Sequence, residues 1–233
     1  MSLEEFRSEV RDRKRFQFGR NWKHFLTYLN EERIKEAECS LKSMLEVKNL
    51  TGKTFLDVGS GSGLFSLAAK NLGADVVSFD YDEASVWCTS ELKNRYYKRD
   101  GTWKVMQGSI LDIKFLETLG KFDYVYSWGV LHHTGEMWRA LDNVVRLVQP
   151  NGSLFIALYN HQQFVSQYWT FVKKTYNKFP ISRPLWIFLH FLYPTLPSIT
   201  LKYLQSTKLP RGMAVWHDLL DWLGGYPFEV STP

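Results

Sequence analysis

The sequence Thr54-Phe-Leu-Asp57-Val-Gly59-Ser-Gly61-Ser-Gly63 predicts the fold more strongly than any other stretch of the chain. A short apolar run leads into alternating glycines, as a buried parallel strand does when it ends in a turn before a helix. Glycines permit positive φ and let the backbone approach a ligand closely, and the helix N-terminus beyond them offers free N–H groups to a carboxylate or phosphate. With Leu64 following Gly63, neither glycine frame completes the G-x-G-x-x-G dinucleotide fingerprint.

Strands and helices alternate on both sides of this loop. The expected strands are residues 54–59, 74–80, 102–109, 121–128 and 152–160. One or two helices are expected over residues 20–46, and others over 63–72, 83–97, the residues before 120, and 137–148. The alternation predicts an α/β fold with a doubly wound, mostly parallel sheet, whose ligand crevice lies at the carboxyl ends of the strands.

The composition is that of a globular protein, with 233 residues, 45% of them apolar and 23% charged, and a net charge of +5. Two cysteines, Cys39 and Cys88, cannot build a disulfide scaffold and suit a reducing compartment. The charged N-terminus is no secretory signal, so we expect a cytoplasmic protein. We divide the chain into an N-terminal helical cap (1–50), an α/β domain (51–160) and a helical, aromatic-rich insertion (161–233).

Asp80 closes the second expected strand about 20 residues after the glycine loop, the spacing at which a ribose-binding acid stands in nucleotide-binding sheets. A carboxylate there can accept hydrogen bonds from both hydroxyls of a ribose. The alternative is a solvated aspartate at a strand end. Asp82 is expected to cap the helix that follows.

The pattern D-x-G-x-G-x-G, which begins at Asp57, resembles motif I of the class I S-adenosylmethionine-dependent methyltransferases. Ser127-Trp128-Gly129-Val130-Leu131-His132-His133 resembles the segment after strand four in small-molecule methyltransferases, including those of ubiquinone and menaquinone biosynthesis. The resemblance covers about residues 50–160. It implies a Rossmann-like methyltransferase fold, S-adenosylmethionine as cofactor and S-adenosylhomocysteine as product. The cofactor-binding residues that it implies are Asp57, Gly59, Ser60, Gly61, Gly63, Asp80, Tyr81, Ser109, Ile110, Ser127 and Trp128.

In the resembling family the turn after the third strand, here Gln107 to Ile110, cradles adenine, often with Asp where Ser109 stands. A serine can still make one hydrogen bond there, with less charge assistance. Tyr81 and Ile110 either sandwich the ring or pack in the core. The amino-methylating enzymes of DNA adenine and of protein glutamine carry (D/N)-P-P-(Y/F) after the fourth strand. This chain has neither proline there, which disfavours that branch.

Four residues are candidates for catalysis: His132, His133, His217 and Asp218. The methyl group on a sulfonium is already a good electrophile, so the protein must align the reactants, exclude water and remove a proton from a hydroxyl or acidic carbon. Either histidine after strand four can act near neutral pH or can cap the next helix. His217 shares a helix side with Asp221, as an acid/base pair or as a polar face. No cluster has metal-ligand spacing, so we expect no metal.

Trp128 and Arg20 are two further residues for which a contact with the cofactor is one of two interpretations. Trp128 either faces the cationic sulfur or the acceptor, or packs in the core. The segment Phe18–Trp22 resembles a segment that lids the cofactor in related enzymes, where Arg20 either meets the cofactor's carboxylate or begins a solvated helix.

The basic charge lies at the end of the chain, because residues 160–233 hold seven Lys and Arg against three Asp and Glu. Apolar helices flanked by basic residues fit a lid over a hydrophobic substrate, an interfacial helix on an anionic membrane, or a homodimer contact. A nucleic-acid partner is less favoured, because the charge is modest and interleaved with apolar residues.

The expected sheet is incomplete beside the seven strands of the resembling family, whose last two form an antiparallel edge. Nothing after Asn160 reads as that pair, and Ser231-Thr232-Pro233 is typical of a helix start. We therefore expect the C-terminal edge strands to be missing and the chain to be truncated.

The sequence thus predicts a class I S-adenosylmethionine-dependent methyltransferase acting by in-line displacement on a small, hydrophobic or anionic acceptor, in the cytoplasm or peripherally at a membrane. Two alternatives stay open. One is a non-catalytic S-adenosylmethionine-binding protein or truncated relic. The other is a protein or RNA methyltransferase, for which the basic insertion would be the docking face. Oxygen, carbon and nitrogen acceptors all remain open.

Overall fold

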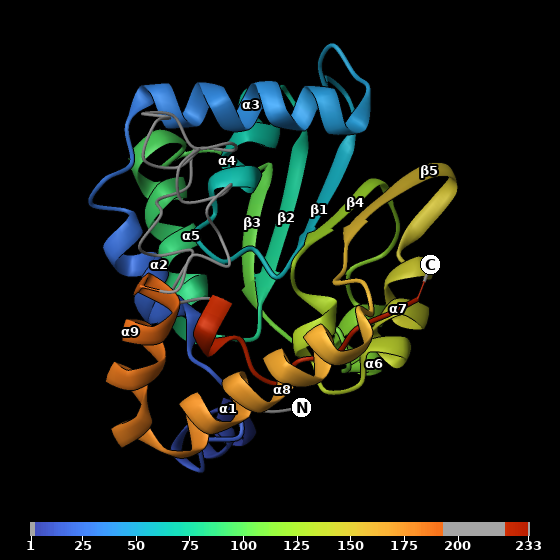
Figure 1. Ribbon diagram of the computed structural model, residues 1–233. Helices are drawn as coiled ribbons and strands as arrows, with labels where there is room; N and C mark the ends of the chain where they lie inside the picture. Colours follow the sequence, from blue (N-terminus) through green and yellow to red (C-terminus); the bar gives the residue numbers. More distant parts are fainter. Residues whose placement is uncertain (1–2, 193–221, 233) are drawn as a thin grey trace.

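A five-stranded parallel sheet forms the centre of the computed structural model, which describes residues 3–192 and 222–232 (Figure 1). The strands are β1 (Thr54–Val58), β2 (Asp75–Asp80), β3 (Trp103–Gln107), β4 (Phe122–Trp128) and β5 (Val148–Ala157). Their spatial order is β3-β2-β1-β4-β5, and every neighbouring pair is parallel. The order reverses between β1 and β4, which is where open α/β sheets bind ligands. The predicted doubly wound fold is confirmed.

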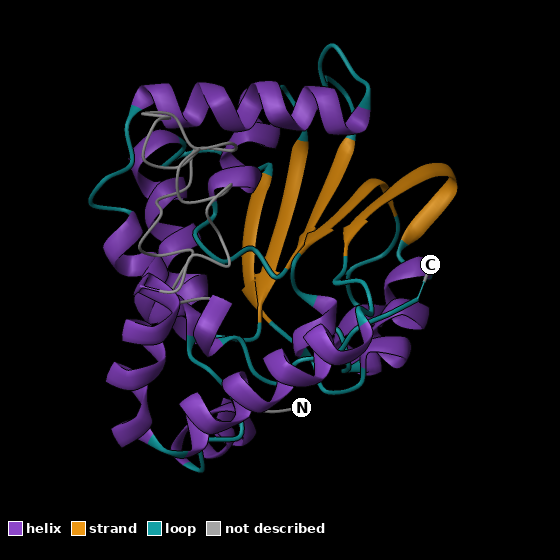
Figure 2. Cartoon of the chain, in the orientation of Figure 1, coloured by secondary structure: helices purple, strands orange, loops and turns teal. Residues whose placement is uncertain are grey.

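Helices cover both faces of the sheet (Figure 2). One face carries α3 (Glu31–Leu45), α4 (Leu64–Asn71) and α5 (Glu83–Tyr96), and the other carries α6 (Ile113–Glu117) and α7 (Met137–Val145). Successive side chains of a strand point to opposite faces. Accordingly, Phe55 of β1 is buried in the core beneath α3, α4 and α5, and its neighbour Leu56 is buried in the core beneath α6 and α7.

The N-terminal residues form α1 (Leu3–Arg11) and α2 (Phe18–Phe25). The helical pattern over residues 20–46 divides at Asn30, whose side-chain oxygen accepts the backbone N–H of Arg33 at 3.0 Å and caps α3. Helix α2 packs against α5. A Cβ on Gly19 would lie 2.6 Å from the Cβ of Ala84, so this close approach needs glycine.

Strand β5 begins earlier than the sequence pattern indicates. The expected helix over 137–148 ends at Val145, and the strand expected from residue 152 begins at Val148. Val148 pairs with Phe122, and the register then shifts before Ser153 pairs with Tyr124. A Cβ on Gly152 would lie 2.9 Å from the carbonyl oxygens of Phe122 and Asp123, so the irregular pairing depends on glycine there. Residue 148 was therefore assigned to the helix, and residues 149–151 to no strand, because this irregular stretch lacks the alternation of a regular strand.

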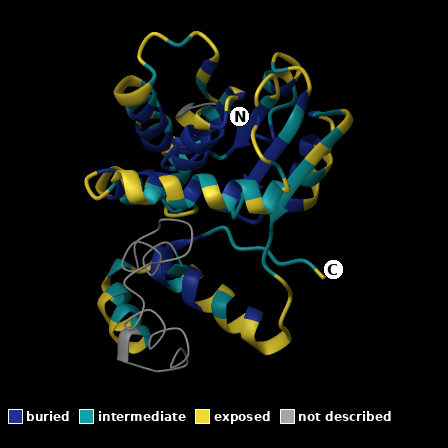
Figure 3. Ribbon diagram, turned by 90° about the horizontal axis from the view of Figure 1, so that it is seen from above, coloured by how far each residue is buried: buried dark blue, intermediate teal, exposed yellow. Residues whose placement is uncertain are grey.

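Residues after β5 form α8 (Gln163–Lys178), the short 3-10 helix η2 (Pro180–Ser182) and α9 (Arg183–Leu192). They lie beside the sheet and its covering helices (Figure 3). A third apolar cluster joins Val172 and Tyr176 of α8 to Leu223. Among the described residues, no helix has the length and apolar character needed to cross a membrane.

The C-terminal segment (residues 225–232) returns to the sheet. The described residues hold no sixth or seventh strand, and residue Ser231 makes one isolated parallel bridge with Asn160. The backbone N–H of Phe16 donates to the carbonyl of Tyr226 at 2.9 Å. The two ends of the described chain therefore meet at the carboxyl ends of the strands.

Candidate functional site

A cavity of about 640 Å³ lies at the carboxyl ends of the strands. Its walls come from the loops after all five strands, from residues 6–22 of the N-terminal region, and from Trp222. Nine of the predicted cofactor residues line it: Asp57, Gly59, Ser60, Gly61, Asp80, Tyr81, Ser109, Ile110 and Trp128. His132 and His133 line it as well.

The glycine loop connects β1 to α4 and needs glycine at three positions. Gly59, Gly61 and Gly63 have φ of 77°, 54° and 81°. A Cβ on Gly59 would lie 2.4 Å from a methyl carbon of Val130, and one on Gly61 would lie 3.0 Å from the indole nitrogen of Trp22. Gly63 does not line the cavity. It caps α4, and its N–H donates to the carbonyl of Ser60 at 2.8 Å.

Asp80 lies at the end of β2 and accepts two backbone hydrogen bonds. The N–H of Gly61 donates to its Oδ2 and the N–H of Asp82 to its Oδ1, each at 2.9 Å. Burial, helped by the charge of Asp82, raises the pKa of Asp80 to about 7. A carboxylate has about four lone-pair positions, so two remain for donors from a ligand.

Asp82 caps α5 as predicted, accepting the N–H of Ala84 at 2.9 Å. Its other oxygen accepts the N–H of Gly19 at 2.8 Å, which ties the start of α2 to the end of β2. Burial raises the pKa of Asp82. One aspartate thus fixes both a helix start and the N-terminal wall of the cavity.

Asp57 ends a buried chain of hydrogen bonds. The indole of Trp103 donates to Ser78 at 3.0 Å, Ser78 donates to Ser66 at 2.7 Å, and Ser66 donates to Asp57 at 2.5 Å. Burial raises the pKa of Asp57 to about 6, although the Ser66 hydrogen bonds oppose this. The cavity floor therefore carries carboxyl groups that are held in place and would ionise more readily beside a cation.

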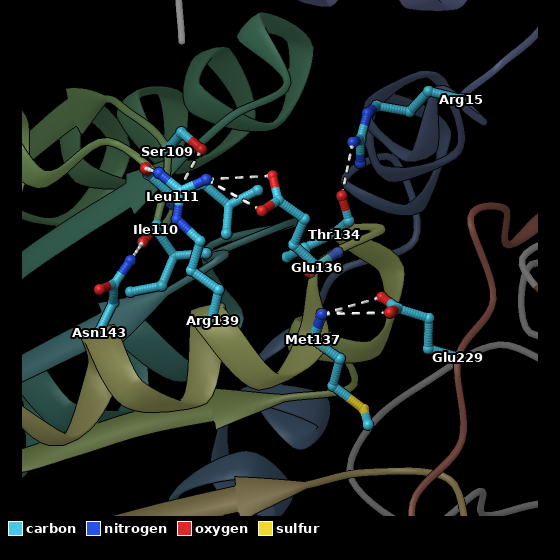
Figure 4. A network of polar contacts seen from close by, with 10 residues as sticks. All are labelled: Arg15, Ser109, Ile110, Leu111, Thr134, Glu136, Met137, Arg139, Asn143 and Glu229. Atoms are coloured by element: carbon cyan, nitrogen blue, oxygen red, sulfur yellow. Dashed lines mark hydrogen bonds and ion pairs between the residues drawn. The ribbon is translucent and has the colours of Figure 1, made fainter.

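Tyr81, Ser109 and Ile110 lie on the β2 and β3 side of the cavity. The Tyr81 ring contacts the edge of Phe6 at 4.9 Å between centroids, and its buried hydroxyl has no hydrogen-bond partner in the described chain. Ser109 accepts the N–H of Leu111 at 3.2 Å. Asn143 of α7 donates to the carbonyl of Ile110 at 2.9 Å and so holds this turn (Figure 4).

Trp128 both lines the cavity and packs on its neighbours. Its ring stacks on Phe155 at 5.8 Å, and Phe155 stacks on Tyr126 at 5.8 Å. Ser127, by contrast, points away from the cavity: its hydroxyl is buried and donates to the carbonyl of Val58 at 3.1 Å. Ser127 joins β4 to β1 and lies outside the cavity wall.

The two histidines lie on the 3-10 helix η1 (Leu131–His133) with different environments. His133 Nδ1 lies 2.6 Å from the carbonyl of Pro227, so it donates to the C-terminal segment. His132 is fully buried and neither ring nitrogen has a hydrogen-bond partner in the described chain. Burial, and secondly the charge of Lys173, lowers the pKa of His132 to about 3. Burial also lowers the pKa of His133.

The remaining candidates lie outside the described residues or outside the cavity wall. His217, Asp218 and Asp221 lie outside the described residues. Arg20 is exposed and does not line the cavity. The arginine that lines it is Arg15.

A model of the methyltransferase domain family matches residues 56–156. The ubiquinone biosynthesis O-methyltransferase of Pseudomonas paraeruginosa is 31% identical over 116 residues, covering 49% of this chain and 48% of that protein. The ribosomal protein L11 methyltransferase of Helicobacter hepaticus is 41% identical over 69 residues, covering 29% and 21%. The residues that the family model matches include the glycine loop, Asp80 and the two histidines of η1. Residues 56–156 therefore form a domain similar to the methyltransferase domain of class I S-adenosylmethionine-dependent enzymes.

Among solved structures, magnesium protoporphyrin IX methyltransferase of Synechocystis PCC 6803 with bound S-adenosylhomocysteine is 19% identical, with a TM-score of 0.48 over 64% of this chain and 69% of that one. The chain spans about half the length of the ubiquinone-biosynthesis relatives that it matches.

The residues of this cavity fit S-adenosylmethionine. The glycine loop leaves no side chain between the backbone and a ligand, since a Cβ on Gly61 would meet Trp22 across the cavity wall. Asp80 offers acceptor positions to ribose hydroxyls, and the buried hydroxyl of Tyr81 offers a hydrogen bond. The carboxyl groups of Asp57 and Asp80 suit a cationic ligand. Among the described residues, no group of His, Cys, Asp and Glu is arranged to hold a metal ion.

Several contacts of this site were not predicted from the sequence, and those of Arg15 are the first. Its guanidinium donates to the carbonyl of Thr134 at 3.1 Å (Figure 4). It also donates to the carbonyl of His133 at 2.7 Å and pairs with Glu9 at 2.5 Å. The only local signal for a buried role of Arg15 was its position next to Phe16. The other arginines of this basic run are exposed, so the run itself did not single out Arg15.

Glu229 is the second residue whose contacts were not predicted from the sequence. Both of its oxygens accept the N–H of Met137, at 3.2 and 3.1 Å (Figure 4). Its own N–H donates to the carbonyl of His132 at 2.9 Å. Glu229 thereby caps α7, whose own N-cap residue Glu136 makes no side-chain cap. No local sequence pattern links residues so far apart.

Proposed function

We propose that this chain transfers the methyl group of S-adenosylmethionine to a small, apolar or anionic acceptor. The observation that carries the proposal is the division of one cavity into two chemically different ends. Asp80, Tyr81 and Ser109 follow β2 and β3, whereas His132 and Tyr159 follow β4 and β5. Neighbouring strands lie about 4.8 Å apart, so the two ends are separated by roughly the length of a nucleoside.

The β2–β3 end suits the cofactor. Asp80 would accept the ribose hydroxyls, Tyr81 and Ile110 would flank the adenine, and Ser109 would contact its edge. When bound, S-adenosylmethionine supplies a methyl group already activated by a sulfonium. The chain's part is to hold the two reactants in line and to keep water away, since rate gains from positioning require a fixed geometry.

The N-terminal residues 6–22 supply the water exclusion. Phe6, Phe16, Phe18 and Trp22 line the cavity from this segment, and Arg15 fastens it to η1. We propose that this N-terminal roof covers the bound cofactor. The α/β domain of residues 51–160 would then supply the floor, and Trp222 would supply part of the far wall.

The β4–β5 end suits the acceptor. Its lining is aromatic and imidazole in character, with Trp128, His132, His133, Tyr159 and Trp222. The Pseudomonas paraeruginosa relative is named as an O-methyltransferase, which makes oxygen the first acceptor atom to test. The Helicobacter hepaticus relative is named for a protein substrate and shares 69 residues, so we favour a small molecule.

The experiment incubates the chain with tritium-labelled S-adenosylmethionine and a cell extract separated by a small-molecule ultrafilter. We expect label in the filtrate, in a product that organic solvent extracts. Label retained with protein or RNA would replace this proposal with a macromolecular acceptor. Cofactor binding without label in any fraction would favour a non-catalytic protein.

We also propose a peripheral contact with an anionic membrane through the outer sides of α8 and α9. This α8–α9 surface exposes the apolar side chains Phe164, Tyr168, Phe171, Leu185 and Phe188. Phe164, Tyr168 and Phe171 continue at helical spacing into the exposed Lys174 and Lys178, and residues 161–192 contain no Asp or Glu. Apolar side chains beside basic ones, without acids, are complementary to anionic lipid. A second copy of the chain is the alternative occupant.

A further inference from the structure

His132 is the most completely buried polar group of the acceptor end. Its side chain has no exposed surface, it lines the cavity, and both ring nitrogens are without a hydrogen-bond partner in the described chain. A neutral imidazole has one N–H donor and one acceptor nitrogen. Buried polar groups are nearly always hydrogen-bonded, so this ring is a site for a ligand that can donate or accept.

His133 is the contrasting neighbour. Its ring nitrogen is bonded to the carbonyl of Pro227 at 2.6 Å, and its ring packs against Phe18 and Phe228. That hydrogen bond fixes the tautomer, with the proton on Nδ1 facing the carbonyl. Both histidines line the cavity, but His133 Nδ1 is used to hold the C-terminal segment, whereas neither ring nitrogen of His132 has a partner among the described residues.

The surroundings of His132 define the shape of a ligand. The Tyr159 ring lies 4.0 Å from the imidazole centroid and is tilted by 38°, and Trp222 contacts the edge of Tyr159 at 5.0 Å. Trp128 lines the same cavity. Flat aromatic walls favour a flat apolar body, and the imidazole favours one polar group on it.

The ionisable groups around His132 come from four elements. Lys173 of α8 is fully buried, and its ammonium lies 4.5 Å from the Trp222 ring centroid and 4.9 Å from that of Phe228. His133 is on η1, Tyr159 follows β5, and Glu229 of the C-terminal segment is directed to the start of α7. The positive charge of Lys173 favours the neutral form of His132 and favours negative charge on a ligand oxygen nearby.

We propose that His132 receives the acceptor's hydroxyl group, and that the acceptor is a flat apolar molecule with a weakly acidic hydroxyl, of the phenol or enol class. This assignment rests on the proposed methyl transfer. The acceptor oxygen forms a bond to the methyl carbon while the bond from that carbon to sulfur breaks, leaving a neutral thioether. The hydroxyl proton passes to the free nitrogen of His132 and then to solvent.

A weakly basic imidazole suffices for this step. The hydroxyl becomes far more acidic as its oxygen bonds to the methyl carbon, so the proton is transferred downhill late in the reaction. Before that, a neutral His132 can accept the hydroxyl's hydrogen bond. Lys173, which does not line the cavity, acts through His132 and is a positioning residue.

The test uses 4-nitrophenol and its methyl ether 4-nitroanisole as probes, added to the full chain saturated with S-adenosylhomocysteine. We expect wild type to bind the phenol at least tenfold more tightly than the ether. In His132→Phe, which keeps a buried ring, we expect the two affinities to become equal. Affinity for S-adenosylhomocysteine and the melting temperature serve as controls that the variant is folded.

Equal affinities for phenol and ether in wild type would overturn the inference, as would a His132→Phe variant that keeps the preference. Failure of wild type to bind S-adenosylhomocysteine would instead contradict the proposed function, so the two failures are distinguishable. In a second arm, Lys173→Met should move the acid limb of phenol binding to higher pH, because His132 becomes easier to protonate. An unchanged pH profile in a folded Lys173→Met would remove Lys173 from the assignment.

Discussion

The backbone N–H of Gly61 donates a hydrogen bond of 2.9 Å to Oδ2 of Asp80, so the acid at the end of β2 directly holds the loop at the end of β1. The two groups that we propose as cofactor contacts are thus fixed relative to each other by a direct hydrogen bond. Ionisation of Asp80 therefore affects the glycine loop as well as the carboxylate itself.

Cofactor affinity should therefore depend on pH through Asp80. Its pKa is raised to about 7, and the ionised carboxylate accepts ribose hydroxyls better than the protonated acid. Affinity should be highest above pH 7 and weaken by up to about tenfold per pH unit below it. Titrations of S-adenosylhomocysteine at several pH values check this, and Asp80→Asn should flatten the curve. A wild-type affinity that rises as the pH falls would contradict it.

Gly59 and Gly120 form a matched pair, because both have positive φ, 77° and 80°, but only Gly59 is crowded. Gly120→Ala should lower the free energy of unfolding by about 1 kcal/mol, the cost of a left-handed conformation. Gly59→Ala must also displace Val130 and should cost about 3 kcal/mol. Urea denaturation measures both. Equal costs would show that Val130 moves aside freely.

Arg15 and Arg20 form a second pair within the N-terminal roof. Arg15→Ala removes hydrogen bonds from a charged group to two carbonyls and should lower the free energy of unfolding by about 2 kcal/mol. It should also speed dissociation of S-adenosylhomocysteine, measured by stopped-flow fluorescence of the tryptophans. Arg20→Ala, at an exposed position, should change neither quantity. Equal dissociation rates in both variants would argue against a roof fastened by Arg15.

The α8–α9 surface should bind vesicles that contain phosphatidylserine and not vesicles of phosphatidylcholine alone. The double variant Lys174→Glu, Lys178→Glu should abolish sedimentation with the anionic vesicles, because each basic residue contributes about 1 kcal/mol at such a surface. Lys98→Glu, on exposed residue 98 following α5, is the charge control and should bind as wild type. A dimer in solution that the Phe171→Ser variant dissociates would instead assign this surface to a second copy.

The sequence predicted what is encoded locally. The glycine loop and Asp80 lie within one strand–helix–strand unit, so spacing alone brought them together. It could not predict contacts between distant segments: Arg15 meets His133 across 118 positions, and His133 meets Pro227 across 94. The irregular start of β5 was missed because its pairing with Phe122 breaks the alternation on which strand prediction relies. The different environments of His132 and His133 likewise depend on the hydrogen bond from His133 to Pro227. No sequence pattern near the two histidines predicts this contact.

The most direct test of the account is a calorimetric titration of S-adenosylhomocysteine into the full chain and into Asp80→Ala. The account predicts micromolar binding at one site per chain in wild type and no measurable binding in the variant, with both proteins folded. Absence of binding in wild type, or equal affinity in the two proteins, would contradict the assignment of this cavity as the cofactor site.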